Sequence, residues 1–157
     1  MLNIIERPAI TVVGMYIRTR PMAPEIPRMW PEFVARTREI GGRTEPGVTY
    51  GVMWDEADSK EVLHYMAAVA VSVPGPILPG MRSLTIPAGD WAVFSYPLSR
   101  LGEGFGEIFN RLLPDSAFEQ SPGPYFERYD ESFCPDDPDS AVAIYLPVRP
   151  RKRQAGS

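Results

Sequence analysis

The chain has 157 residues, of which 44% are hydrophobic, and it carries a net charge of −4 with 16 basic and 20 acidic side chains. This length and composition predict one domain that buries a substantial core without disulfides or metals. The acidic balance argues against nucleic acid as the main partner, because nucleic-acid-binding surfaces are basic. No apolar run reaches the length of a membrane span and the start lacks the features of a signal peptide, so we expect no membrane contact and a cytoplasmic protein.

Cysteine and histidine each occur once, as Cys134 and His64. A single cysteine cannot form an intramolecular disulfide or a thiolate metal cluster, and a single histidine limits Ser-His or Cys-His catalysis. We therefore expect no metal site and no cofactor.

The first elements in the chain are a predicted strand and a predicted helix. Residues 6–18 alternate with apolar side chains on both faces, which is typical of a central strand, and Gly14 indicates a bulge or the close approach of another backbone. Apolar residues then recur at helical spacing from residue 26 to residue 40, where a pair of glycines ends the helix. Trp30 belongs to this apolar stripe, and we interpret it as a core residue.

Two strands and a linker complete the first half. Residues 50–56 and 61–73 predict strands that are joined by a turn-forming segment. The proline-rich stretch 73–80 cannot continue a strand, because proline lacks the backbone donor. We interpret it as the linker between two halves of the chain.

The second half repeats this order. Residues 82–96 predict a long strand with a break near its middle, and residues 101–113 predict a helix. Three glycines near the start of this helix do not complete a dinucleotide-binding pattern, and we interpret them as room for close backbone contact. A polar loop over residues 116–124 leads to a strand at 125–131, and a last strand begins at residue 141.

The strand 125–131 places a carboxylate among aromatic residues. Tyr125, Glu127 and Tyr129 share one face, because side chains alternate across a strand. Burying an unpaired carboxylate costs free energy. Glu127 is therefore a solvated edge residue, a hydrogen-bonded structural acid, or a charge that awaits a ligand.

A second copy of this stretch indicates an internal repeat. Residues 50–56 align with residues 125–131 without a gap, and the alignment places Val52 where the second copy has Glu127. Internal repetition of this kind sets the architecture of a fold.

The repeat also predicts the domain organisation. Repeat one covers about residues 1–73 and repeat two about residues 81–149. Neither repeat alone has more than three strands and a helix, so we expect one domain over residues 1–150 that unfolds as a single unit. The basic residues in the stretch 151–157 are expected to form a disordered tail.

Four segments stand in a distinctive order and spacing: Glu6-Arg7-Pro8, Ile86-Pro87-Ala88-Gly89-Asp90-Trp91, the helix through Phe105 and Phe109, and Phe126-Glu127-Arg128-Tyr129 after Gly123-Pro124. In these segments the chain resembles the GyrI-like small-molecule-binding family, which is related to the effector-binding domains of BmrR-type and Rob-type transcription regulators. The resemblance covers nearly the whole length, and the order and spacing of the segments make the match.

The resemblance implies an α+β fold of two strand-helix-strand-strand repeats, related by a pseudo-twofold, that form an antiparallel-rich sheet with a cleft between the halves. It also implies that a glutamate in the strand before the last one lies in an aromatic pocket for lipophilic, often cationic compounds. Glu127 matches that position, with Tyr129 beside it. Regulators of this group carry a DNA-binding domain ahead of the module. Because the first strand begins almost at Met1, we expect no direct contact with nucleic acid.

Four functions stay open. The first is a stand-alone module that binds aromatic or cationic small molecules, as multidrug-binding proteins do, because aromatic faces and one carboxylate attract a desolvated cation. The candidate ligand-binding residues are Glu127, Tyr129, Tyr125, Trp54, Trp91, Tyr16, Phe94 and Phe105.

The second function is an enzyme, because the resemblance extends to hydrolases that open the cyclopropane ring of electrophilic aromatic compounds. Glu127 would be the catalytic general base, since apolar walls raise the pKa of a carboxylate, and Glu103, Glu107 and Glu56 are candidates for a second acid. The third is interaction with a protein partner, which a cleft filled by its own side chains would favour. The fourth is haem binding through His64, because the SOUL haem-binding family resembles this fold. A structural role is more common for such a histidine, so we expect no specific haem binding.

Overall fold

The computed structural model describes residues 2–56 and 58–152, without the side chain of Lys60. These residues form a nine-stranded antiparallel sheet and two α-helices, which confirms the predicted α+β class. The strands are β1 (Asn3–Arg7), β2 (Ile10–Thr19), β3 (Thr49–Glu56), β4 (Ser59–Val71), β5 (Met81–Ile86), β6 (Gly89–Pro97), β7 (Phe118–Gln120), β8 (Tyr125–Tyr129) and β9 (Ala141–Pro150). The helices are α1 (Glu25–Arg36), which continues into a 3₁₀ turn (Thr37–Glu39), and α2 (Leu101–Glu107), which follows a 3₁₀ turn (Leu98–Arg100) and continues into a π-helical turn (Ile108–Leu112).

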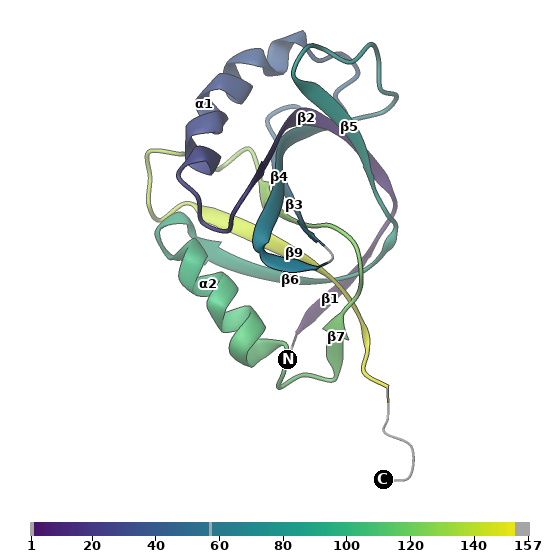
Figure 1. Cartoon of the computed structure of the whole chain (residues 1–157), viewed down its shortest axis with the longest axis vertical. Helices are drawn as coiled ribbons and strands as arrows, with labels where there is room; N and C mark the ends of the chain where they lie inside the picture. Colours follow the sequence, from purple (N-terminus) through teal and green to yellow (C-terminus); the bar gives the residue numbers. More distant parts are fainter. Residues whose placement is uncertain (1, 57, 153–157) are drawn as a thin grey trace.

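Two long strands, each interrupted by a proline, pair with each other along their length. β1 and β2 are the two parts of one strand around Pro8, and β5 and β6 are the two parts of the other around Pro87. β1 pairs with β6 and β2 pairs with β5. The strand order is β1-β6-β9-β8-β3-β4-β2-β5, so its two ends belong to these paired long strands, and the sheet curls into a ring (Figure 1).

The ring has an outer face covered by the helices and an enclosed inner face. Both α1 and α2 lie outside the ring (Figure 1). The core cluster beneath them joins Phe33 of α1 to Ile144 of β9, and the inner cluster joins Val52 of β3 to Trp91 of β6. Each cluster takes residues from both halves of the chain, which is the arrangement expected of halves that share one core.

The predicted repeat alignment matches residues that lie on opposite faces of the sheet in β3 and β8. β3 pairs with β8 so that Gly51 lies opposite Glu127 and Val52 lies opposite Phe126. Val52 belongs to the inner cluster, whereas Tyr125 belongs to the outer one, with Glu127 on the same side of β8. A shift of one residue moves every side chain to the other face of a strand. Gly51, and not Val52, is therefore the residue of the first half that faces Glu127.

Gly14 marks a close approach of two backbones and not a bulge. The pairing of β2 with β4 is regular through this position. A Cβ at Gly14 would overlap the backbone oxygen of Ala67. Gly104 of α2 has a similar use, because a Cβ there would lie 2.6 Å from the ring of Tyr96, whereas a Cβ at Gly106 would have no atom closer than 4.0 Å.

One other expectation needs correction. The segment predicted as a polar loop before β8 contains the short strand β7, which pairs with β9. Arg151, the first residue of the predicted basic tail, donates hydrogen bonds to the backbone oxygens of Leu113 and Ser116. The rest of the predicted disordered tail, residues 153–157, lies outside the described residues. In the described part of the chain, no helix is both long and apolar enough to cross a membrane.

Candidate functional site

Glu127 lies in the middle of β8, a strand with a neighbour on each side, and the residue is only 6% exposed. Its Oε1 accepts hydrogen bonds from the hydroxyl of Tyr65 at 3.0 Å and from the hydroxyl of Tyr129 at 2.8 Å. Glu127 is therefore not a solvated edge residue. We call this carboxylate and the side chains around it the Glu127 niche, formed by Glu127, Tyr65, Tyr129, Gly51 and Trp30.

Gly51 gives the carboxylate its room. A Cβ at this position would lie 2.5 Å from Oε1 of Glu127 and would overlap the hydroxyl of Tyr65. Real Cβ atoms do not make contacts this short, so any other residue would displace one of the two groups. Gly51 is thus part of the niche although it has no side chain.

Trp30 of α1 covers the two phenols. Its Nε1 donates a hydrogen bond to the hydroxyl of Tyr65 at 3.0 Å, and its ring meets the ring of Tyr129 edge to face with centroids 5.3 Å apart. A chain of hydrogen bonds therefore runs from the indole through Tyr65 to Glu127. Trp30 is only partly buried, so it closes the niche in addition to the core role predicted for it.

Burial controls the ionisation of the niche. It raises the pKa of Glu127 to about 7, and the hydrogen bonds from Tyr129 and Tyr65 offset part of that rise. Burial also raises the pKa of both phenols well above the ordinary value, and the charge of Glu127 adds to this effect. The phenols therefore stay neutral donors, while Glu127 is balanced near neutral pH between its protonated and ionised forms.

The second carboxylate oxygen of Glu127, Oε2, is not hydrogen-bonded as Oε1 is. Among the described residues it accepts no hydrogen bond, and no basic side chain of that part of the chain forms an ion pair with Glu127. An ionised carboxylate in a desolvated place is stabilised by an opposite charge. A cation that reached Oε2 would supply it.

A second aromatic group continues along the outer face toward α2. The ring of Tyr125 meets the ring of Phe105 with centroids 6.5 Å apart and the ring of Phe109 with centroids 6.3 Å apart. Phe94 packs against the same outer cluster. The structure therefore brings five of the predicted site residues to the outer face: Glu127, Tyr129, Tyr125, Phe105 and Phe94.

The other three predicted wall residues lie on the opposite face of the sheet. Trp54, Trp91 and Tyr16 belong to the inner cluster. They do not surround Glu127, because the sheet itself lies between them and the carboxylate.

Sequence reasoning did not assign Trp30, Tyr65 and Gly51 to the site. Trp30 comes from α1 and Tyr65 from β4, so their contact with Glu127 depends on how distant elements pack. Gly51 alone carried a local signal, because a glycine inside a strand often marks the close approach of another group.

The three acids considered as a partner for Glu127 are engaged elsewhere. Their ion pairs are Glu56 with Arg18 at 3.0 Å, Glu103 with Arg100 at 3.1 Å and Glu107 with Arg111 at 2.6 Å. In the described part of the chain, none of them is hydrogen-bonded to the phenols of the niche. The niche therefore offers one carboxylate.

His64 is held by its neighbours on the inner face. Its Nδ1 shares a hydrogen bond of 2.5 Å with the hydroxyl of Tyr16, and its Nε2 lies 3.5 Å from Oε1 of Glu56. Within the residues that the structure describes, no group of three His, Cys, Asp or Glu side chains is placed to hold a metal ion.

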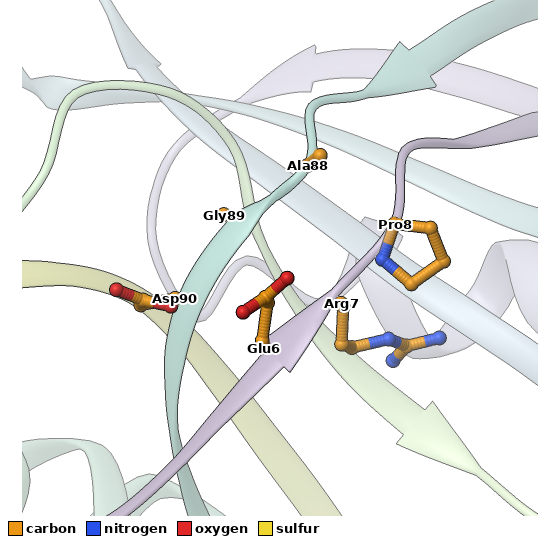
Figure 2. A pocket seen from close by; sticks show the side chains of 6 residues that line it. All are labelled: Glu6, Arg7, Pro8, Ala88, Gly89 and Asp90. Carbon is orange, nitrogen blue, oxygen red and sulfur yellow. The ribbon is translucent and has the colours of Figure 1, made fainter.

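Two hollows open elsewhere on the molecule. One, of about 440 Å³, lies where the two long strands break, and it is lined by Glu6, Arg7, Pro8, Ala88, Gly89 and Asp90 (Figure 2). The other, of about 590 Å³, lies beside Trp54 at one end of the ring. Glu127 lines neither of them, since Trp30 covers its niche.

Comparison with known proteins gives one family and one curated relative. A model described as the GyrI-like small molecule binding domain matches residues 1–149. Transcriptional regulator BrlR of Pseudomonas aeruginosa is 36% identical over 150 residues, which cover 93% of this chain and 54% of the regulator. The chain thus spans about half the length of that relative.

Solved structures share the fold at low sequence identity. SAV2435 bound to tetraphenylphosphonium has a TM-score of 0.73 at 16% identity, and the match covers 95% of this chain and 94% of SAV2435. An integron cassette protein from the mobile metagenome of Vibrio cholerae has a TM-score of 0.65 at 18% identity, with coverage of 94% and 95%. At these identities the likeness shows the arrangement of strands and helices.

Proposed function

This chain belongs to the GyrI-like small-molecule binding domain family, and from that premise we propose that it binds lipophilic aromatic compounds, cations above all, at the Glu127 niche. The observation that carries the proposal is a buried carboxylate with one oxygen held by two phenols and the other without a partner among the described residues. Oε2 keeps some contact with solvent, since it is not among the fully buried side-chain atoms of the described residues that lack a hydrogen-bond partner. The oxygen bonded by Tyr65 and Tyr129 orients the group, and the other is left for a ligand.

The surroundings of the carboxylate suit an aromatic cation. Trp30, Tyr129 and Tyr65 present aromatic rings on the same side as Glu127. A desolvated cation gains both from such rings and from the carboxylate. An anion of the same shape would be repelled, and a neutral compound would gain only apolar contacts. We expect the niche to select for charge more strongly than for shape.

Trp30 must move before a bulky ligand reaches Glu127. Its displacement breaks the hydrogen bond to Tyr65, which contributes about 1 kcal/mol. Pro31, the next residue, lies inside α1 and supplies no backbone donor to the helix. The covering side chain is thus attached to a helix whose hydrogen-bond ladder is incomplete at that point.

The named relatives support this class of ligand and its setting. Tetraphenylphosphonium, which SAV2435 binds in its solved structure, is a lipophilic aromatic cation. The relative from P. aeruginosa is a transcriptional regulator. We propose further that the present chain acts in the cytoplasm and makes no direct contact with nucleic acid, which its net charge of −4 supports.

Three tetrahedral or near-tetrahedral probes test the proposal: tetraphenylphosphonium as the cation, triphenylphosphine oxide as the neutral compound and tetraphenylborate as the anion. Glu127→Gln keeps the shape and the acceptor oxygen but removes the charge. We expect this substitution to weaken binding of the cation by roughly 1 to 3 kcal/mol, which is about 5- to 150-fold in affinity. Binding of the neutral probe should change much less.

Glu103→Gln is the matched control, because Glu103 is an exposed acid on α2 with its own ion pair. Equal binding of tetraphenylphosphonium to wild type and Glu127→Gln would overturn the proposal, as would equal losses for the charged and neutral probes.

A second candidate function is hydrolysis of electrophilic aromatic compounds, and the pKa of Glu127 favours it. A carboxylate with a pKa of about 7 has the basicity that suits a general base at neutral pH. The test is whether the wild-type protein consumes a cyclopropane-bearing aromatic electrophile. If it does, and if Glu127→Gln loses this activity but still binds ligand, hydrolysis is the better description of the function. No turnover by wild type would remove this candidate.

A further inference from the structure

The two ends of the strand ring differ in what fills them. Near the start of β3, the hydroxyl of Tyr50 donates to Oε1 of Glu45 at 2.5 Å, and Nη2 of Arg128 donates to Oε2 of the same carboxylate at 2.7 Å. The guanidinium of Arg7 lies over the ring of Phe126, 5.2 Å from its centroid. The protein's own charged and aromatic side chains therefore occupy the interior at this end, and Arg7 separates them from the smaller hollow that it also lines.

The hollow of about 590 Å³ lies at the other end, near the last residues of β3. Trp54 and Leu84 line it, and both pack against the inner cluster, so its floor is apolar and continuous with the interior of the ring. Asp55, Arg149 and residues 120–124 form its polar rim. Its volume lies within the range of small-molecule sites, about 300 to 1,000 Å³. We call it the Trp54 hollow.

The aromatic floor is held in place before any ligand arrives. The indole of Trp54 lies parallel to the ring of His64, with centroids 5.4 Å apart and an interplanar angle of 0°. Tyr16 stacks on both rings, and its own far side is covered by the guanidinium of Arg82 at 3.7 Å from the ring centroid. A flat surface that is already ordered loses little entropy when a second flat ring stacks on it.

The charges on the rim leave one carboxylate without compensation. Nε of Arg149 donates to Oε2 of Glu119 at 3.0 Å, so this pair is neutral. Asp55 receives only a long hydrogen bond, 3.5 Å, from the hydroxyl of Tyr125. Of the side chains that the structure describes, none forms a salt bridge with Asp55. A ligand in the hollow would therefore meet an aromatic floor and a negative rim.

We propose that the Trp54 hollow is a second small-molecule site, which takes flat aromatic compounds with a positive charge. The ring system of the ligand stacks on Trp54 at the inner face, and its cationic group reaches over the end of β3 to Asp55, whose side chain leaves the opposite face of the strand beside Tyr125. This site goes beyond the function proposed above, because it lies at the end of the ring and does not use Glu127. The two sites differ in shape preference, since one presents a flat indole and the other a carboxylate between phenols.

Proflavine, a flat tricyclic cation, is the probe, and acridine at mildly alkaline pH is its uncharged counterpart. The experiment uses Glu127→Gln protein, so that the niche cannot contribute a charge contact. We expect proflavine to bind this variant, and a further Asp55→Asn change to weaken it about tenfold, as for loss of a charge-assisted contact. Acridine should be nearly unaffected. Asp58→Asn, which removes an exposed acid of the same turn region, is the matched control.

Trp54→Leu provides an independent check, because it removes the stacking surface and leaves the charge. It should weaken proflavine and acridine alike. Equal proflavine affinity in the Asp55→Asn and Asp58→Asn proteins would overturn the second site, and so would complete loss of proflavine binding in Glu127→Gln alone. Tetraphenylphosphonium, titrated in parallel, reports on the Glu127 niche, so failure of one site is distinguished from failure of the other.

Discussion

Replacement of Glu127 by glutamine should make the protein's stability respond differently to pH. In the folded protein the pKa of Glu127 is about 7, against an ordinary value of 4.5, and burial is the cause. The unfolded chain therefore loses this proton near pH 4.5 while the folded chain keeps it to about pH 7. Between these values the folded state binds more protons, so stability falls as pH rises through that window and is constant above it.

The size of the effect follows from the shift. A difference of about 2.5 pKa units, from 4.5 to about 7, corresponds to about 3 kcal/mol at 1.36 kcal/mol for each unit. Glutamine does not titrate, and its carbonyl oxygen can accept the hydrogen bonds that Tyr65 and Tyr129 donate. Relative to wild type, Glu127→Gln should therefore gain about 3 kcal/mol of stability as pH rises from below 4.5 to above 7.

Urea unfolding of both proteins across this range, followed by circular dichroism, measures the difference directly. Subtracting the two curves cancels every other titrating group that the substitution leaves unchanged. A difference that stays constant with pH would refute the account of a buried carboxylate with a raised pKa. A difference of the opposite sign would show that the ionised form is the one stabilised by folding.

Three further predictions concern two glycines of the sheet and the single histidine. Gly51→Ala should lower the free energy of unfolding by about 1 to 3 kcal/mol and weaken cation binding, because the new Cβ displaces Glu127 or Tyr65; unchanged values in both assays would contradict the role given to Gly51. Gly14→Ala should destabilise the fold more than Gly89→Ala, since only the first would strike a backbone atom, and equal urea midpoints would show that β2 has room to adjust. Haem should cause no Soret shift that depends on His64, because Tyr16 and Glu56 already engage its ring; a shift abolished by His64→Ala would show the prediction to be wrong.

Local pattern placed most strands and helices and put Glu127 between two phenols, whereas the fold as a whole was implied by the family resemblance. Alternation alone placed Tyr125, Glu127 and Tyr129 on one face, and the structure shows all three there with Glu127 buried. Glycine and proline punctuation placed the break in the second long strand and the linker between the halves, but it missed the break at Pro8 in the first long strand. These signals depend on a few neighbouring residues, so they can be recognised in the sequence without knowledge of the fold.

Register and distant contacts were beyond that reasoning. The repeat alignment matches the residue types well, because Tyr50 and Tyr125 are identical, but it aligns positions on opposite faces of β3 and β8. For the same reason Trp54, Trp91 and Tyr16 were wrongly grouped with Glu127. The sequence does not show which face of the sheet an aromatic residue occupies. The indole that covers the carboxylate comes from a helix, and no spacing along β8 points to it.

The most direct test of the central claim is whether binding of an aromatic cation releases a proton from Glu127. Titration calorimetry with tetraphenylphosphonium near pH 7, in two buffers of different ionisation enthalpy, measures this number. With a pKa of about 7, close to half of the free protein carries the proton, so binding to the ionised form should release about half a proton per cation. Glu127→Gln should release none. An apparent enthalpy that does not change with buffer, or equal proton release by both proteins, would contradict the claim that Glu127 is the cation's counter-charge.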